Sequence, residues 1–154
     1  QEKNHIYRFV WLCRNAIMET IYGIGIDIVK LSRIEQIIQR WGNKFLQRTF
    51  TQQEIKYCSS KTFPNQHYGA RFAAKEAVFK ALGTGWSHGV SWLDVEVCID
   101  PDSGQPSISL SGKCLEILGE PSSFRVLVSL SHDREYAIAQ AMILKTTKER
   151  VCNS

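Results

Sequence analysis

The sequence predicts an α+β fold in which an antiparallel sheet packs against one long central helix. Residues 71–85 are rich in Ala, Leu, Lys, Glu and Phe, lack proline and include a helix-ending glycine at position 83, so they predict a long helix. Residues 93–99, 124–130 and 136–142 show the period-two alternation typical of strands. Turn-rich segments favour hairpins between strands, and hence an antiparallel sheet.

Length and composition limit the class of protein. The 154 residues suit one domain with a real core, and the net charge of +4 is that of an ordinary soluble globule. No apolar run is long enough to span a bilayer, so no membrane role is expected. The five cysteines are odd in number and form no Cys-x-x-Cys pair, which argues against a disulfide framework or a zinc site and favours the reducing cytoplasm.

The chain is expected to divide into an N-terminal extension, one domain and a short tail. Residues 1–17 hold an apolar stretch that is short for a secretory core and lacks a small-residue cleavage site, so they do not predict a signal peptide. Met18 is a candidate natural start, and the extension before it is expected to be loosely ordered. The domain then covers residues 18–144, and residues 145–154 form the tail.

The first predicted strand covers residues 21–28, where a β-branched, apolar run predicts a buried strand. Gly23 and Gly25 are typical of a strand that another backbone or a ligand approaches closely. Asp27 is costly to bury unless it is paired or binds a metal; alternatively, it caps the helix that follows. The alternating isoleucines of this run are Ile24, Ile26 and Ile28.

Three short helices are predicted next, over residues 31–41, 44–50 and 51–59. Apolar residues recur with helical spacing in the first, which Ser32 can cap and Gly42 can end. Thr51 and Glu54 have the spacing of a capping box at the start of the third. The central helix is expected to begin at about residue 67.

A basic surface is predicted on these helices. Residues 30–80 contain ten lysines and arginines against three acidic residues, which suggests an acidic partner: a nucleic acid, an anionic membrane or an acidic protein. Arg33 and Arg40 lie two helical turns apart, and Lys44 and Arg48 one turn apart, so each pair shares a face. From the pattern alone, this surface is either merely solvated or a docking site.

Three features are candidates for chemistry. Glu76 and Lys80 share one face of the central helix, so they form either an ordinary surface pair or a site for a cation and a phosphate. The glycines of residues 83–85 allow the chain to pass close to a phosphate. Ser131 and His132 belong to a polar cluster between two strands, where a lone histidine is more often structural than functional.

The C-terminal half completes the sheet. Residues 100–106 are dense in turn residues, and residues 107–110 are expected to return as the hairpin partner of the strand before them. Residues 111–118 predict a short helix that ends at Gly119, before the last two strands.

Four short motifs occur in order along the chain. They are Gly-Ile-Asp at 25–27, Arg-Phe-Ala-Ala-Lys-Glu-Ala at 71–77, Lys-Ala-Leu-Gly-Thr-Gly at 80–85 and Val-Ser-Leu-Ser-His at 128–132. Together they resemble the motifs of the holo-[acyl-carrier-protein] synthases, the small trimeric class of 4′-phosphopantetheinyl transferases. The resemblance extends from about residue 21 to residue 143. Each motif alone is weak evidence, whereas four in order are specific.

The resemblance implies transfer of 4′-phosphopantetheine from coenzyme A to a serine of apo acyl carrier protein, in support of fatty acid biosynthesis. It implies that Asp27 and Glu76 hold Mg²⁺, that Glu76, Lys80 and His132 act in catalysis, and that each site lies between two subunits of a homotrimer. The residues implied to bind the coenzyme are Lys80, Gly83, Thr84, Gly85, Ser131 and His132. Those implied to dock the acidic carrier protein are Arg33, Arg40, Lys44 and Arg48.

Two other functions remain open from the residues themselves. A different Mg²⁺-dependent phosphotransferase, acting on a small nucleotide, would keep Asp27 and Glu76 without needing the basic face. A nucleic-acid-binding module would use the basic half, but it would normally show interleaved exposed aromatic residues or a known reading motif. The glycine motifs of P-loop and Rossmann proteins and the Gly-x-Ser-x-Gly elbow of hydrolases are absent.

Overall fold

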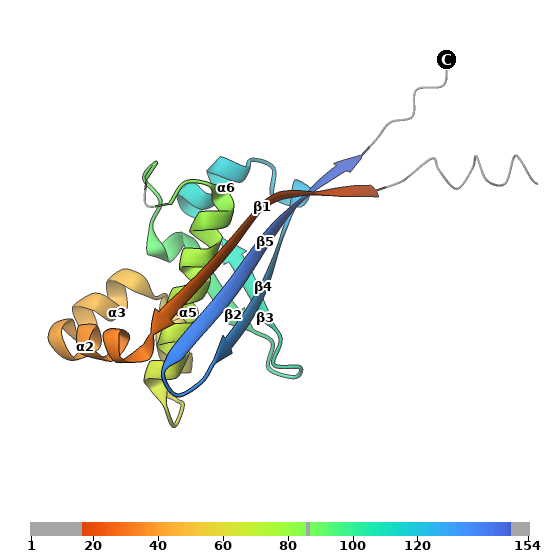
Figure 1. Ribbon diagram of the computed structural model, residues 1–154. Coiled ribbons are helices and arrows are strands. Elements are labelled where there is room, and N and C mark those ends of the chain that lie inside the picture. Colours follow the sequence, from red (N-terminus) through yellow and green to blue (C-terminus); the bar gives the residue numbers. More distant parts are fainter. Residues whose placement is uncertain (1–16, 86, 149–154) are drawn as a thin grey trace, which may run out of the picture.

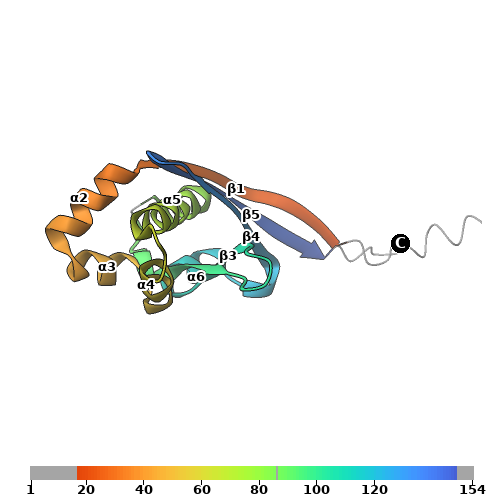
Figure 2. The ribbon, with the colours of Figure 1, turned by 90° about the horizontal axis from the view of Figure 1, so that it is seen from below.

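The computed structural model describes residues 17–85 and 87–148, and a three-stranded sheet covers one side of its longest helix (Figures 1 and 2). The sheet has the strand order β1-β5-β4, and both pairings are antiparallel. A second sheet is the antiparallel hairpin β2-β3. The predicted α+β fold is confirmed, with its strands divided between two sheets. The strands are β1 (Ile17–Lys30), β2 (Val95–Ile99), β3 (Pro106–Leu110), β4 (Phe124–His132) and β5 (Tyr136–Lys148).

The helices lie close to their predicted positions. They are α2 (Leu31–Trp41), α3 (Asn43–Thr49), α4 (Gln52–Ser59), α5 (Pro64–Leu82) and α6 (Gly112–Leu118), with short 3-10 turns η2 (Trp92–Asp94) and η3 (Pro121–Ser123). The capping box of α4 is confirmed, because the Thr51 side chain accepts from the Glu54 N–H while Glu54 accepts from the Thr51 N–H. No helix among residues 17–85 and 87–148 is long and apolar enough to cross a membrane.

Two local predictions are wrong, and a third falls mostly outside the described residues. Ser32 does not cap α2, because the strand continues to Lys30 and Ser32 already lies inside the first helical turn. Leu93 belongs to η2, and the strand β2 begins only at Val95. Most of the predicted N-terminal extension, residues 1–16, lies outside the described residues.

Helix α5 is buried on nearly all sides because it lies between the three-stranded sheet and a layer that contains α4, α6 and the β2-β3 hairpin (Figure 2). It begins at Pro64, slightly before the predicted start, since proline suits the first helical turn. It ends where predicted: Gly83 adopts a left-handed conformation (φ 76°), and its N–H donates to the Lys80 carbonyl.

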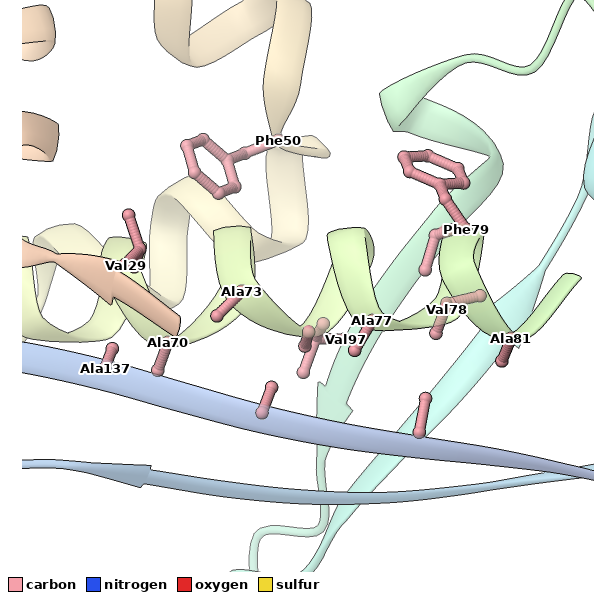
Figure 3. Packing of buried hydrophobic residues seen from close by; sticks show 14 of the residues in the cluster. Val29, Phe50, Ala70, Ala73, Ala77, Val78, Phe79, Ala81, Val97 and Ala137 are labelled. Atoms are coloured by element: carbon pink, nitrogen blue, oxygen red, sulfur yellow. The ribbon is translucent and has the colours of Figure 1, made fainter. Parts of the chain in front are cut away.

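Small residues bring β1 and α5 very close together. A Cβ atom on Gly25 would collide with the carbonyl of Ala77, and one on Gly23 would collide with the carbonyl of Ala81. The prediction that these glycines mark the close approach of another backbone is therefore confirmed. Figure 3 shows alanines where α5 packs against the sheet; those labelled are Ala70, Ala73, Ala77, Ala81 and Ala137.

The isoleucines of β1 face away from the helix. The prediction that this strand is buried is therefore wrong for the single chain. Side chains alternate along a strand, and the glycine positions face α5. Ile24, Ile26 and Ile28 therefore project from the outer face of the sheet and are each more than half exposed. Leu127 of β4 and Ile138 of β5 are also exposed there. Among residues 17–85 and 87–148, none covers this apolar face.

A buried ion pair joins α5 to the opposite layer. Lys75 Nζ lies 2.7 Å from Glu54 Oε2, and the two side chains are 0% and 1% exposed. Lys75 also donates to the carbonyls of Trp92 and Val95, at 2.9 and 2.6 Å. Glu54 accepts the N–H of Val97 at 3.0 Å, so the pair connects α4, α5 and β2. Burial lowers the pKa of Lys75, and the Glu54 carboxylate opposes that change.

Candidate active site

An ion pair marks the place where β1 packs against the C-terminal half of α5. Lys80 Nζ lies 2.9 Å from Asp27 Oδ1 and donates a 2.8 Å hydrogen bond to the carbonyl of Ile26. The side chains of Asp27 and Lys80 are 18% and 48% exposed, so solvent reaches the pair. Asp27 is thus paired, which is one of the two environments expected for an aspartate in this apolar strand. The alternative that it caps α2 is wrong, because the N-cap is Lys30.

Glu76 lies on the same helix as Lys80. It precedes Lys80 by one turn of α5, so both side chains leave one side of the helix. Glu76 is half-buried, and the next residue, Ala77, contacts Gly25, two positions before Asp27 in β1. Glu76 and Lys80 therefore share the side of α5 on which Lys80 meets Asp27 of β1.

The chemistry of these groups suits a hard cation that also binds phosphate. Within the described ranges, no group of three or more His, Cys, Asp and Glu side chains is placed to hold a metal ion. Magnesium, however, is usually held by one or two carboxylates, with water and substrate phosphates as its other ligands. Asp27 and Glu76 therefore suit Mg²⁺ as two carboxylate ligands, in a site that a substrate phosphate would complete.

The glycine loop follows directly on α5. Gly83 and Gly85 both have positive φ angles, 76° and 52°, which other residues rarely adopt. The loop folds back on the helix end, because the Gly85 N–H donates to the Phe79 carbonyl at 3.4 Å. Thr84 is half-buried and its hydroxyl donates to the Gly85 carbonyl. The loop thus begins three residues after Lys80, as the sequence suggested.

His132 lies on the other edge of the sheet. Asp27 is on β1 and His132 on β4, with β5 between them, so their backbones are separated by about 10 Å or more. The ring of His132 instead contacts His67 near the start of α5, with the ring centroids 5.7 Å apart. Ser131 precedes His132 in the strand, so its side chain points to the opposite, outer face. One chain does not bring all the predicted site residues together.

A basic cluster surrounds this histidine pair, and the sequence did not reveal it. Arg71 Cζ and Lys61 Nζ each lie 4.2 Å from the ring centroid of Tyr57, and His67 packs edge-on against the same ring. Arg71 is only 2% exposed, and its Nε has no hydrogen-bond partner among the described residues. Burial lowers the pKa of His67, and the neighbouring Arg71, His132 and Lys61 lower it further. The cluster therefore has the charge to bind an anion.

The predicted docking residues are all exposed. Arg33 and Arg40 lie on α2, and Lys44 and Arg48 lie on α3, which packs against α2. The two helices contain one acidic residue, Glu35. Glu35 lines a separate cavity of about 510 Å³, between the start of α2, residues 62–66 at the start of α5 and the β4–β5 turn. None of the predicted site residues lines that cavity.

Comparisons with known proteins show the family to which the chain belongs. The sequence model of the 4′-phosphopantetheinyl transferase superfamily matches residues 23–141. A holo-[acyl-carrier-protein] synthase of Protochlamydia amoebophila is 46% identical over 120 residues, which are 78% of this chain and 95% of that protein. One of Syntrophus aciditrophicus is 45% identical over 129 residues, covering 84% of this chain and 99% of that protein.

Solved structures give the same result. A Bacillus anthracis holo-(acyl-carrier-protein) synthase in complex with CoA (3′,5′-ADP) has a TM-score of 0.67 and 36% identity, and the match covers 84% of this chain and 99% of that one. The Neisseria meningitidis synthase has a TM-score of 0.73 and 33% identity, with 80% and 98% covered. The chain belongs to the 4′-phosphopantetheinyl transferase superfamily and, within it, to the holo-[acyl-carrier-protein] synthases.

Proposed function

We propose that this chain transfers 4′-phosphopantetheine from coenzyme A to a serine of apo acyl carrier protein, in the cytoplasm and in support of fatty acid biosynthesis. The products are the holo carrier protein and adenosine 3′,5′-bisphosphate. The observation on which the proposal rests is the Asp27–Lys80 pair, with Glu76 beside it and the glycine loop directly after it. The similar proteins are holo-[acyl-carrier-protein] synthases, and the Bacillus anthracis structure is a complex with CoA (3′,5′-ADP).

The reaction exchanges one phosphorus–oxygen bond for another. The serine oxygen of the carrier attacks the phosphorus that bears pantetheine, and the bond from this phosphorus to the oxygen of adenosine bisphosphate breaks. Negative charge grows on the departing oxygen, so a fixed cation beside the pyrophosphate lowers the barrier. Lys80 provides that cation, and its bonds to Asp27 and Ile26 hold the ammonium in place.

Asp27 and Glu76 are the residues of this chain that would hold Mg²⁺. When bound, the ion neutralises charge on the pyrophosphate. The positive φ angles of Gly83 and Gly85 give the loop a backbone conformation that suits the close approach of a phosphate. A base must also accept the serine proton.

The position of His132 supports a site built from two subunits. The basic cluster of Lys61, His67, Arg71 and His132 suits a second phosphate of the coenzyme, but His132 lies across the sheet from Asp27. A neighbouring subunit that presented its cluster to the Asp27 flank would complete the site. Coenzyme A has both a pyrophosphate and a 3′-phosphate, so it can engage both regions.

We expect the active protein to be a trimer, because the apolar outer face of the sheet gains stability when subunits cover it. Ile26→Lys should shift the mass measured by light scattering towards a monomer and remove activity, since it places a charge in the centre of this face. Gln105→Lys, at an exposed hairpin turn, is the matched control and should remain trimeric. An active monomer of the unaltered chain would contradict this expectation.

The direct test of function uses the complete chain with coenzyme A, Mg²⁺ and an unmodified acyl carrier protein. Mass spectrometry should show the carrier gaining one phosphopantetheine group. The same reaction should release adenosine 3′,5′-bisphosphate in equal amount. A carrier whose mass stays unchanged while the protein is folded and binds coenzyme A would overturn the proposal.

Reversing two charges on α2 should weaken docking of the carrier protein. In the variant Arg33→Glu/Arg40→Glu, KM for the carrier should rise about tenfold or more at low salt, because two attractive contacts become repulsive. The rise should shrink at high salt, and KM for coenzyme A should stay within about twofold, since its phosphates are assigned elsewhere. An unchanged carrier KM at low salt would mean that this face is only solvated.

A further inference from the structure

One large aromatic side chain on the basic helices is left uncovered by the fold. Trp41 ends α2 and is 54% exposed. It follows Ile34 and Ile38 at helical spacing, so it continues the apolar side of α2, yet Ile34 is buried and Trp41 is not. The chain turns away at Gly42, which has a positive φ of 50°, and α3 leaves the indole open to solvent.

One positive charge contacts this indole, and others lie on the same two helices. The guanidinium carbon of Arg40 lies 5.2 Å from the centroid of the Trp41 ring, which is the range of a cation–π contact. Lys44 and Arg48 follow on α3, and Arg33 lies two turns earlier on α2. The surface therefore combines an exposed aromatic ring with several cations.

We propose that Trp41, with Arg40 held against its ring, is the apolar anchor by which this chain docks the acidic acyl carrier protein. The proposal rests on the function proposed above. Charge complementarity selects an acidic partner, but exposed ion pairs contribute little binding free energy and are weakened by salt. A tryptophan that becomes buried at an interface contributes much more, and tryptophan and arginine are the residue types most enriched among binding hot spots.

The partner surface that matches is an amphipathic acidic helix. Its apolar side chains would cover the indole, and its carboxylates would meet Arg40 and the other cations around it. The Arg40–Trp41 contact also limits the conformations of both side chains before binding, which reduces the entropy cost of docking. Trp41 thus sets affinity, while the charges set encounter rate and orientation.

The experiment measures carrier transfer by the complete chain with Trp41→Ala, Trp41→Phe and the control Leu93→Ala, at low and high salt. Leu93 is also an exposed apolar residue, at 42%, but it lies on η2, outside the basic helices. We expect Trp41→Ala to raise KM for the carrier about tenfold or more at both salt concentrations, because burial of apolar surface does not depend on screening. Trp41→Phe should lose less, and Leu93→Ala should match the unaltered chain.

Further readouts separate this inference from its alternatives. KM for coenzyme A, turnover at saturating carrier and the thermal midpoint of Trp41→Ala should stay near those of the unaltered chain. A carrier KM unaffected by Trp41→Ala overturns the inference, as does a loss that Leu93→Ala reproduces. A variant that loses only binding to a single-stranded oligonucleotide assigns the ring to nucleic acid instead. If the unaltered chain modifies no carrier, the proposed function itself fails.

Discussion

Alanine in place of Asp27 or Glu76 is expected to lower transfer turnover by about a thousandfold or more while the chain stays folded. Each substitution removes one of the two carboxylates assigned to Mg²⁺ beside the pyrophosphate. Loss of metal assistance costs several kcal/mol in the transition state, and each 1.4 kcal/mol corresponds to about tenfold in rate. Both side chains are partly exposed, so removing either one leaves few buried polar groups without a partner. The fold should therefore persist in both variants.

Chelation gives an independent test of the same assignment. EDTA should stop transfer by the unaltered chain, and added Mg²⁺ should restore it, whereas neither should change the residual rate of Asp27→Ala. Binding of Mn²⁺ in the presence of coenzyme A, followed by electron paramagnetic resonance, should be weaker in both variants. Glu116→Ala removes an exposed carboxylate on α6 and serves as the control. Full activity in EDTA would refute the metal assignment.

Part of the fold and of the site was predictable because the signals are local. The capping box of α4 needs only Thr51 and Glu54, three residues apart, and the end of α5 needs only Gly83. An aspartate within an apolar strand has few acceptable environments, so the need for a partner at Asp27 was also visible in the sequence. Its identity was not, because Lys80 lies 53 positions away and reaches Asp27 only through the packing of β1 on α5.

The orientation of β1 shows the limit of pattern reasoning. An apolar run with Ile24, Ile26 and Ile28 predicts burial but does not say which face of the strand meets the core. Gly23 and Gly25 determine which face of β1 meets the core, because the absence of side chains there allows α5 to approach that face. The basic cluster was equally hidden, since Tyr57 and Arg71 come from different helices and meet only in the tertiary structure.

The buried ion pair of Lys75 with Glu54 was not visible in the sequence for the same reason, since its partners come from different helices. Replacing Lys75 should cause the largest loss of stability. In Lys75→Met, the Glu54 carboxylate stays buried without its counter-charge, and the carbonyls of Trp92 and Val95 lose their donor. Removing one partner of a buried ion pair typically costs about 3–5 kcal/mol, because the remaining charge is desolvated and uncompensated. The free energy of unfolding, measured by urea titration at one fixed protein concentration, should fall by that amount.

The second lysine–carboxylate pair on the same helix provides the matched control. Lys80→Met removes an ammonium from a pair that is 48% and 18% exposed, so water can solvate the remaining carboxylate. Its stability cost should be below about 1 kcal/mol, although transfer activity should be largely lost. Equal stability losses in Lys75→Met and Lys80→Met would contradict the distinction between the two pairs. The expected divergence follows from burial alone: in α5, the lysine shielded from water stabilises the fold, and the lysine that solvent reaches remains available to the substrate.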